Sequence, residues 1–217
     1  MKRIVFLLAV ICLVTLAYGQ SNSIPDYQAA SGSWAVSGNR LYQNDAAARL
    51  AKININAPQS GPMLYEFNAR YESGAEDGHG GFGLHVFGDR SYPSVSWGSG
   101  RSYLLWLNYD ESPANSRIPR GLSAQIYQSL SNSRMDLVES VDLNEYAPLL
   151  TQENLSSEVP FRITIDGNTG EVRVYDPTDA NLESYRYFYI DGSNTPLRGD
   201  WVALRTNGMR LSFALGL

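Results

Sequence analysis

Apolar and polar residues alternate along two segments near the middle of the chain, residues 82–87 and 103–109. In each segment the apolar residues recur at every second position. They are Phe82, Leu84 and Val86 in the first and Tyr103, Leu105, Leu107 and Tyr109 in the second. Because successive side chains of a strand point to opposite faces, this pattern predicts two strands, each with one apolar and one mixed face. A shorter extended piece is expected between them at residues 94–97.

Similar signals along the rest of the chain predict an all-β protein, a two-sheet antiparallel sandwich. Further strands are expected at residues 33–36, 40–43, 45–56, 63–72, 122–129, 134–143, 161–165, 171–175, 186–190, 200–206 and 209–215. The Ala-rich start of residues 45–56 also suits a helix, but the alternation of residues 53–56 favours a strand that Pro58 ends. Residues 144–154 are expected to form one or two helical turns.

The mixed faces of these strands carry the candidate ligand-binding residues. If Leu105 and Leu107 point into the core, the residues between and beside them point away from it. The face predicted in this way contains Trp106, Asn108, His85 and Tyr127, with Trp97 nearby, and Tyr175 is also expected to be exposed. Sugar rings stack on Trp and Tyr while polar groups bond their hydroxyls.

Two interpretations of this face remain open: a glycan platform, or a surface covered by a loop or a protein partner. Trp106→Ala is expected to weaken binding to a glycan or protein partner and to leave the fold intact. Leu105→Ala is expected to cost about 2–5 kcal/mol of stability, as a core truncation does.

The first residues resemble a secretory signal peptide. Lys2 and Arg3 precede an apolar run over residues 4–17, which small residues follow. We therefore expect a signal peptide at residues 1–19, a leader at 20–32 and one sandwich domain at 33–217. The run is short for a membrane span, so no membrane insertion is expected. Its Cys12 is the only cysteine, and a cysteine-free mature chain favours a periplasmic or secreted bacterial protein over a secreted eukaryotic one.

The charge of the chain argues against two classes of partner. The formal charge is −5, and the loss of Lys2 and Arg3 with the signal peptide removes two positive charges and makes it −7. The chain has no block of like charge, so neither nucleic acid nor an anionic membrane is an expected partner. Fourteen Tyr and nineteen Gly agree with a β-rich chain that has many turns.

The acidic residues do not predict a catalytic site. Glycan-cleaving enzymes of the sandwich type place carboxylates at alternate positions of one strand, because the two groups need a fixed separation. No predicted strand has such a triplet, since Glu139, Asp142 and Glu145 fall at every third position. We therefore expect that this protein is not an enzyme.

A metal site is the remaining chemical candidate. His79 and His85 lack the further ligands that a transition metal needs. Calcium, with oxygen ligands from Asp77, Asp110 or another loop carboxylate, is the possible cofactor.

Four scattered segments resemble the concanavalin A-like, or laminin G-like, family. These segments are SWAVSGNRLYQ, GGFGLHVFGDRSY, VPFRITIDGNTGEVRVYDP and WVALRTNGMRLSF. The resemblance implies a jelly roll of two antiparallel sheets, one of them concave, in a secreted protein often tied to glycan binding. It implies no reaction.

The mixed strand face and the resemblance to the family together lead us to expect a secreted, non-catalytic, lectin-like module that binds carbohydrate. The alternative is a structural subunit of a periplasmic or cell-surface assembly, such as a filament or flagellar sheath coat, with a protein as its partner. Glycoside hydrolysis is a third and weaker candidate.

Overall fold

A computed structural model describes residues 26–146, 158–176, 179, 181, 183–190 and 196–215. These residues contain fourteen strands and one short 3₁₀-helix, η1 (Asn144–Tyr146). The strands are β1 (Tyr27–Ser31), β2 (Trp34–Ser37), β3 (Arg40–Gln43), β4 (Ala51–Ser60), β5 (Pro62–Gly74), β6 (His79–Gly88), β7 (Ser102–Asp110), β8 (Gly121–Ser129), β9 (Met135–Asp142), β10 (Val159–Asp166), β11 (Glu171–Tyr175), β12 (Tyr185–Tyr189), β13 (Arg198–Asn207) and β14 (Met209–Leu215).

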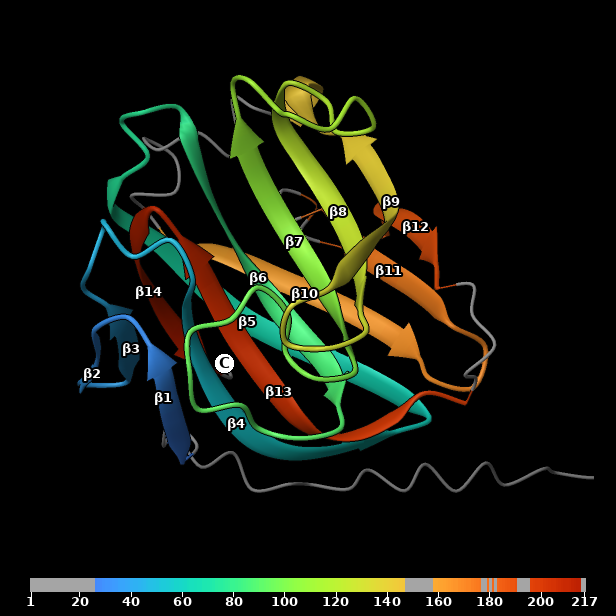
Figure 1. Cartoon of the computed structure of the whole chain (residues 1–217). Coiled ribbons are helices and arrows are strands. Elements are labelled where there is room, and N and C mark those ends of the chain that lie inside the picture. Colours follow the sequence, from blue (N-terminus) through green and yellow to red (C-terminus); the bar gives the residue numbers. More distant parts are fainter. Residues whose placement is uncertain are drawn as a thin grey trace, which may run out of the picture.

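The strands form two seven-stranded antiparallel sheets that pack face to face (Figure 1). The front sheet, nearer the viewer in Figure 1, has the order β1-β4-β13-β6-β7-β8-β9. The back sheet has the order β12-β11-β10-β5-β14-β3-β2. The predicted two-sheet sandwich is therefore confirmed.

The core lies between the sheets and is built from the alternating apolar positions. Leu84 and Leu105 of the front sheet and Phe67 of the back sheet belong to one buried cluster. Phe161 stacks on Phe67, with ring centroids 5.3 Å apart, and meets Phe82 edge to face at 5.2 Å. Aromatic pairs of this geometry add to the stabilisation that burial alone provides.

The late hairpin follows its sequence pattern. Ile163 pairs with Val174 and Ile165 with Val172, so the apolar residues of β10 and β11 share one face. The expected helical turn begins at Asn144 as η1, and residues 147–154 of that prediction lie outside the described residues. No helix among the described residues is long and apolar enough to cross a membrane. The predicted signal peptide lies outside them.

Two boundaries near the start of the chain differ from the sequence prediction. Residues 27–31, expected in the leader, form β1 and pair with β4. β4 starts at Ala51 and continues past Pro58 to Ser60. The proline is tolerated because β1 pairs with β4 only as far as Ile55, so its missing N–H disrupts no bond on that edge.

The segment between β6 and β7 also differs. Residues 94–97, expected to be extended, form no strand and belong to a loop over residues 89–101. Phe87, placed on the mixed face by alternation, lies in the core with a φ of 53°. The register between β6 and β13 shifts at this end, and such a bulge changes the face to which a side chain points.

Candidate functional site

The face of the front sheet that points away from the back sheet, which we call the outer face, carries the predicted ligand-binding residues. Strand register arranges its side chains in rows across the sheet. One row contains Lys52, Arg205, Gly83, Trp106 and Gln125, and the next contains Asn54, Ala203, His85, Leu104 and Tyr127. Trp106, His85 and Tyr127 therefore lie opposite the core residues of their strands, as alternation predicts.

The 89–101 loop covers one end of this face. In Figure 1 it runs in green across β13 and β4. Lys52 Nζ donates a hydrogen bond to Ser96 Oγ (2.6 Å), and Asn54 Nδ2 donates one to the carbonyl of Tyr92 (3.2 Å). Arg205 donates a hydrogen bond to the carbonyl of Trp97. Three side chains of the sheet thus hold the loop in place.

Arg205 joins the loop to the middle of the face through aromatic rings. Its guanidinium carbon lies 5.1 Å from the ring centroid of Trp97 and 5.8 Å from that of Trp106. Trp97 in turn meets Tyr127 edge to face at 6.4 Å. Burial lowers the pKa of Arg205 to about 10, so the side chain remains charged at neutral pH. We call Trp97, Trp106, Tyr127 and Arg205 the aromatic cluster.

Trp106 lies flat in this cluster, because Gly81 leaves room for its ring. A β-carbon added at Gly81 would lie 2.5 Å from Cζ2 of Trp106. The indole Nε1 donates a hydrogen bond to Oδ1 of Asn108 (3.0 Å). Trp106 is only 9% exposed. The expectation that Trp106 is an exposed anchor is therefore wrong, because its ring packs on its own sheet and against Arg205.

His85 is also buried, beneath the loop and not in contact with solvent. The hydroxyl of Ser102 donates to the carbonyl of Ser99, so Nδ1 of His85 donates to Ser102 Oγ (3.0 Å). Nε2 then has a lone pair with no hydrogen-bond partner in the described part of the chain. Burial, and then the charges of Arg205 and Lys52, hold the pKa of His85 well below its usual value. This histidine is neutral at pH 7.

Trp97, unlike Trp106 and His85, is exposed to solvent. Its side chain is 46% exposed, although Arg205 and Tyr127 hold it from two sides. Tyr127 and Asn108 are half-buried. The structure thus brings together all five predicted ligand-binding residues, and Trp97 offers the largest accessible aromatic surface among them. A fixed, exposed indole ring beside polar groups suits stacking against the apolar face of a sugar.

Sequence reasoning missed the two buried cations of this face, Lys52 and Arg205. Alternation could have identified Arg205. Leu204 points into the core, so its neighbours Ala203 and Arg205 must both point to the outer face. Burial, and then the charge of Arg205, lowers the pKa of Lys52 to about 8. Neither cation forms an ion pair with a carboxylate in the described part of the chain. Oxygens of the loop are the partners that make their burial tolerable.

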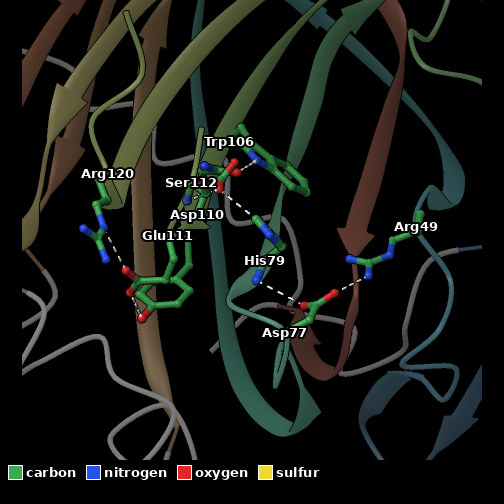
Figure 2. Close-up of polar contacts among 10 residues, drawn as sticks. Arg49, Asp77, His79, Trp106, Asp110, Glu111, Ser112 and Arg120 are labelled. Carbon is green, nitrogen blue, oxygen red and sulfur yellow. Dashed lines mark hydrogen bonds and ion pairs between the residues drawn. The ribbon is translucent and has the colours of Figure 1, made fainter. Parts of the chain in front are cut away.

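The candidate calcium ligands lie elsewhere, where β6 begins and β7 ends (Figure 2). Asp77 pairs with Arg49 and accepts a hydrogen bond from the backbone N–H of His79 (3.1 Å). Asp110 lies 2.9 Å from Nδ1 of His79 and accepts a bond from the N–H of Ser112 (2.8 Å). No group of three or more acidic, His or Cys side chains suited to a metal lies within the described residues. Both candidate carboxylates are thus already paired with side chains of the protein.

Comparison with known proteins places the fold among lectin-like sandwiches. No family model matches the chain, and no curated protein matches it. The carbohydrate-binding module CBM66 from Bacillus subtilis is 12% identical, with 88% of this chain and 93% of that chain covered and a TM-score of 0.54. The exoplasmic/lumenal domain of VIP36, in a Ca²⁺- and Man-bound form, is 13% identical (88% and 83% covered, TM-score 0.54). Peanut lectin is 14% identical (88% and 93% covered, TM-score 0.52). The chain therefore has a lectin-like jelly-roll fold.

Proposed function

We propose that this protein is an exported, non-catalytic carbohydrate-binding module whose ligand stacks on Trp97 at the outer face of the front sheet. The observation that carries the proposal is the exposed Trp97 ring, which Arg205 and Tyr127 hold in one orientation. A ring that is already immobilised loses little freedom when a sugar binds to it. The names of CBM66 and of peanut lectin support carbohydrate as the ligand class.

Polar groups on the outer face supply the hydrogen bonds that a sugar needs. Asn108 uses its Oδ1 for Trp106, and its amide nitrogen has no partner within the described residues. Tyr127 donates its hydroxyl proton to Gln125 Oε1 (2.7 Å), which leaves the phenolic oxygen as an acceptor. Donor and acceptor thus lie on the same face as the stacking ring, as carbohydrate recognition requires.

Trp97→Ala tests this proposal. A glycan array identifies the glycan that the wild type binds. We expect the affinity of the variant for this glycan to be at least tenfold lower, because a central aromatic anchor carries much of the binding energy. The matched control is Val95→Ala, in the same loop and 65% exposed, which should bind as the wild type does. A wild type that retains no glycan, or a Trp97→Ala variant with unchanged affinity, contradicts the proposal.

One observation favours the second candidate, a structural subunit that binds protein. β12 is an edge strand of the back sheet, and Tyr185, Tyr187 and Tyr189 on it are all exposed. Tyrosine is common in protein interfaces, and an unpaired edge strand offers free backbone groups. Because this surface belongs to the other sheet, Trp97→Ala separates the two functions: it removes glycan binding and leaves β12 intact.

Export is part of the proposal and rests on the sequence of residues 1–19. We expect the protein recovered from the periplasm or medium of a bacterial expression host to begin near Gln20 and to carry no lipid. Intact-mass spectrometry measures both properties. A mature chain that begins with a lipid-modified Cys12 would show that the leader is a lipoprotein signal.

A further inference from the structure

A cavity of about 490 Å³ lies between the two sheets, away from the outer face. Its wall on the front sheet comes from β6, β7 and β8, and its wall on the back sheet comes from β5, β10, β11 and β12. The apolar lining residues are Phe67, Phe82, Leu84, Leu105, Leu107, Ala124, Ile126, Leu143, Phe161, Ile163, Val174 and Phe188. This volume is within the range of sites that hold drug-sized ligands, about 300–1,000 Å³.

Packing around the cavity is incomplete on both sheets. Leu107 and Ala124 of the front sheet and Phe161 and Val174 of the back sheet point inward, yet all four are only half-buried. Protein interiors are normally packed as densely as organic crystals, with few voids larger than a water molecule. An apolar space of this size is therefore better explained as a place for a ligand than as ordinary core packing.

The chemistry of the lining selects the part of a ligand that can enter. Trp106 and Gln125 border the cavity, but their side chains point to the outer face. The described residues therefore present hydrocarbon to the interior of the cavity, from Phe82 at one side to Ile163 at the other. A sugar would lose its hydrogen bonds to water here without replacement, whereas a hydrocarbon chain would not.

Among the described lining residues, polar side chains gather at one end of the cavity. Asp176, Glu183, Ser184 and Arg186 line it there, together with Tyr175 and Tyr185, whose ring centroids are 5.5 Å apart. Residues 183–186 are exposed, so this end reaches solvent. Arg186 forms an ion pair with Glu145. The cavity thus has an apolar interior and a polar rim, which matches the two parts of an amphiphile.

We infer that this cavity binds the hydrocarbon chain of a single-chain amphiphile, such as a fatty acid, with the polar head of the ligand at the rim formed by residues 183–186. The inference does not depend on glycan binding, because the cavity and Trp97 lie on opposite sides of the front sheet.

Calorimetric titration of the purified, delipidated chain with hexanoate, octanoate, decanoate and dodecanoate, each below its micellar concentration, tests the inference. We expect one ligand per chain and a dissociation constant that falls about fourfold for each added methylene group. No binding of dodecanoate, or an affinity independent of chain length, overturns it.

Filling the cavity gives the second arm of the test. Ala124→Phe places an aromatic ring in the cavity, and we expect dodecanoate affinity to fall at least tenfold while circular dichroism shows a folded chain. Ala35→Phe makes the same change at an exposed position of β2 and should bind as the wild type does. If Ala124→Phe does not fold, Leu107→Trp replaces it. A folded cavity-filling variant with unchanged affinity shows that the fatty acid binds elsewhere and contradicts the inference.

Discussion

Strands β6, β7 and β8 have two faces that differ in how closely their side chains are packed. On the outer face, His85 and the neighbouring Lys52 and Arg205 are at most 3% exposed, although all three are polar. On the inner face, apolar residues border a space of about 490 Å³. Hydrophobicity alone would predict the reverse, a dense inner face and a solvated outer face.

The difference shows that coverage by another segment, and not polarity, decides which face is closed. The 89–101 loop brings oxygen atoms to the cations of the outer face, among them Ser96 Oγ and the carbonyl of Trp97. Buried polar groups are stable when such partners are present. The inner face is covered by the back sheet, but among the described residues no side chain fills the space of about 490 Å³ that the two sheets leave between them, so the apolar surface around this space is available to a ligand.

Trp106→Ala and Leu105→Ala compare the two faces most directly, because these neighbours point to opposite sides of β7. We expect Trp106→Ala to lower the unfolding free energy by about 3–5 kcal/mol, since it empties a closed site. Leu105→Ala should cost about 2–4 kcal/mol, because the space it leaves joins an existing cavity. Urea denaturation measures both.

The exposed Tyr109, on the same strand, provides the control: Tyr109→Ala should change the unfolding free energy by about 1 kcal/mol or less. A cost below about 1 kcal/mol for Trp106→Ala would mean that the outer face is open in solution, as the sequence alone suggested.

Lys52 tests the outer face by its pH dependence. Its pKa is about 8 in the folded chain and 10.5 in its ordinary state. Between these values the unfolded chain binds more protons, so the unfolding free energy rises with pH. From pH 7.5 to 9.5 we expect the wild type to gain about 2 kcal/mol relative to Lys52→Met, as measured by urea denaturation at each pH. Parallel pH profiles for the two proteins would show that Lys52 is solvated.

Local patterns predicted most of the fold. Alternation identified the strands, the inward direction of Leu84 and Leu105, and the outward direction of His85 and Trp106. These properties depend only on neighbouring residues of one strand. The pairing of β10 with β11 was predictable for the same reason, because the four-residue loop 167–170 fixes its register.

The burial of the outer face was not predictable in this way. It depends on contacts between residues far apart in the sequence, such as Lys52 with Ser96, and the 89–101 loop has no periodic pattern of its own. The inward position of Phe87 depends on a bulge against β13, which alternation within one strand does not reveal. The cavity depends on the distance between the two sheets, which the residue pattern of a single segment does not reveal.

The smallest expected loss of unfolding free energy comes from the exposed ion pairs where β6 begins and β7 ends. It serves as a reference for the losses expected on the two faces of the front sheet. Asp77 pairs with Arg49, and both side chains are about half exposed. Exposed pairs contribute about 0.2–1 kcal/mol, so Asp77→Asn should lower the unfolding free energy by less than about 1 kcal/mol in EDTA.

The same variant tests calcium binding at Asp77 and Asp110. Because Arg49 and His79 already pair with these carboxylates, a calcium ion would have to displace both side chains, and we expect 1 mM calcium to leave the unfolding free energy of the wild type unchanged. A site with a dissociation constant of about 10 μM would instead raise it by about 2.7 kcal/mol. A rise of that size in the wild type that is absent from both Asp77→Asn and Asp110→Asn would establish calcium as a ligand of this strand end. It would also show that the carboxylates exchange their protein partners for the metal.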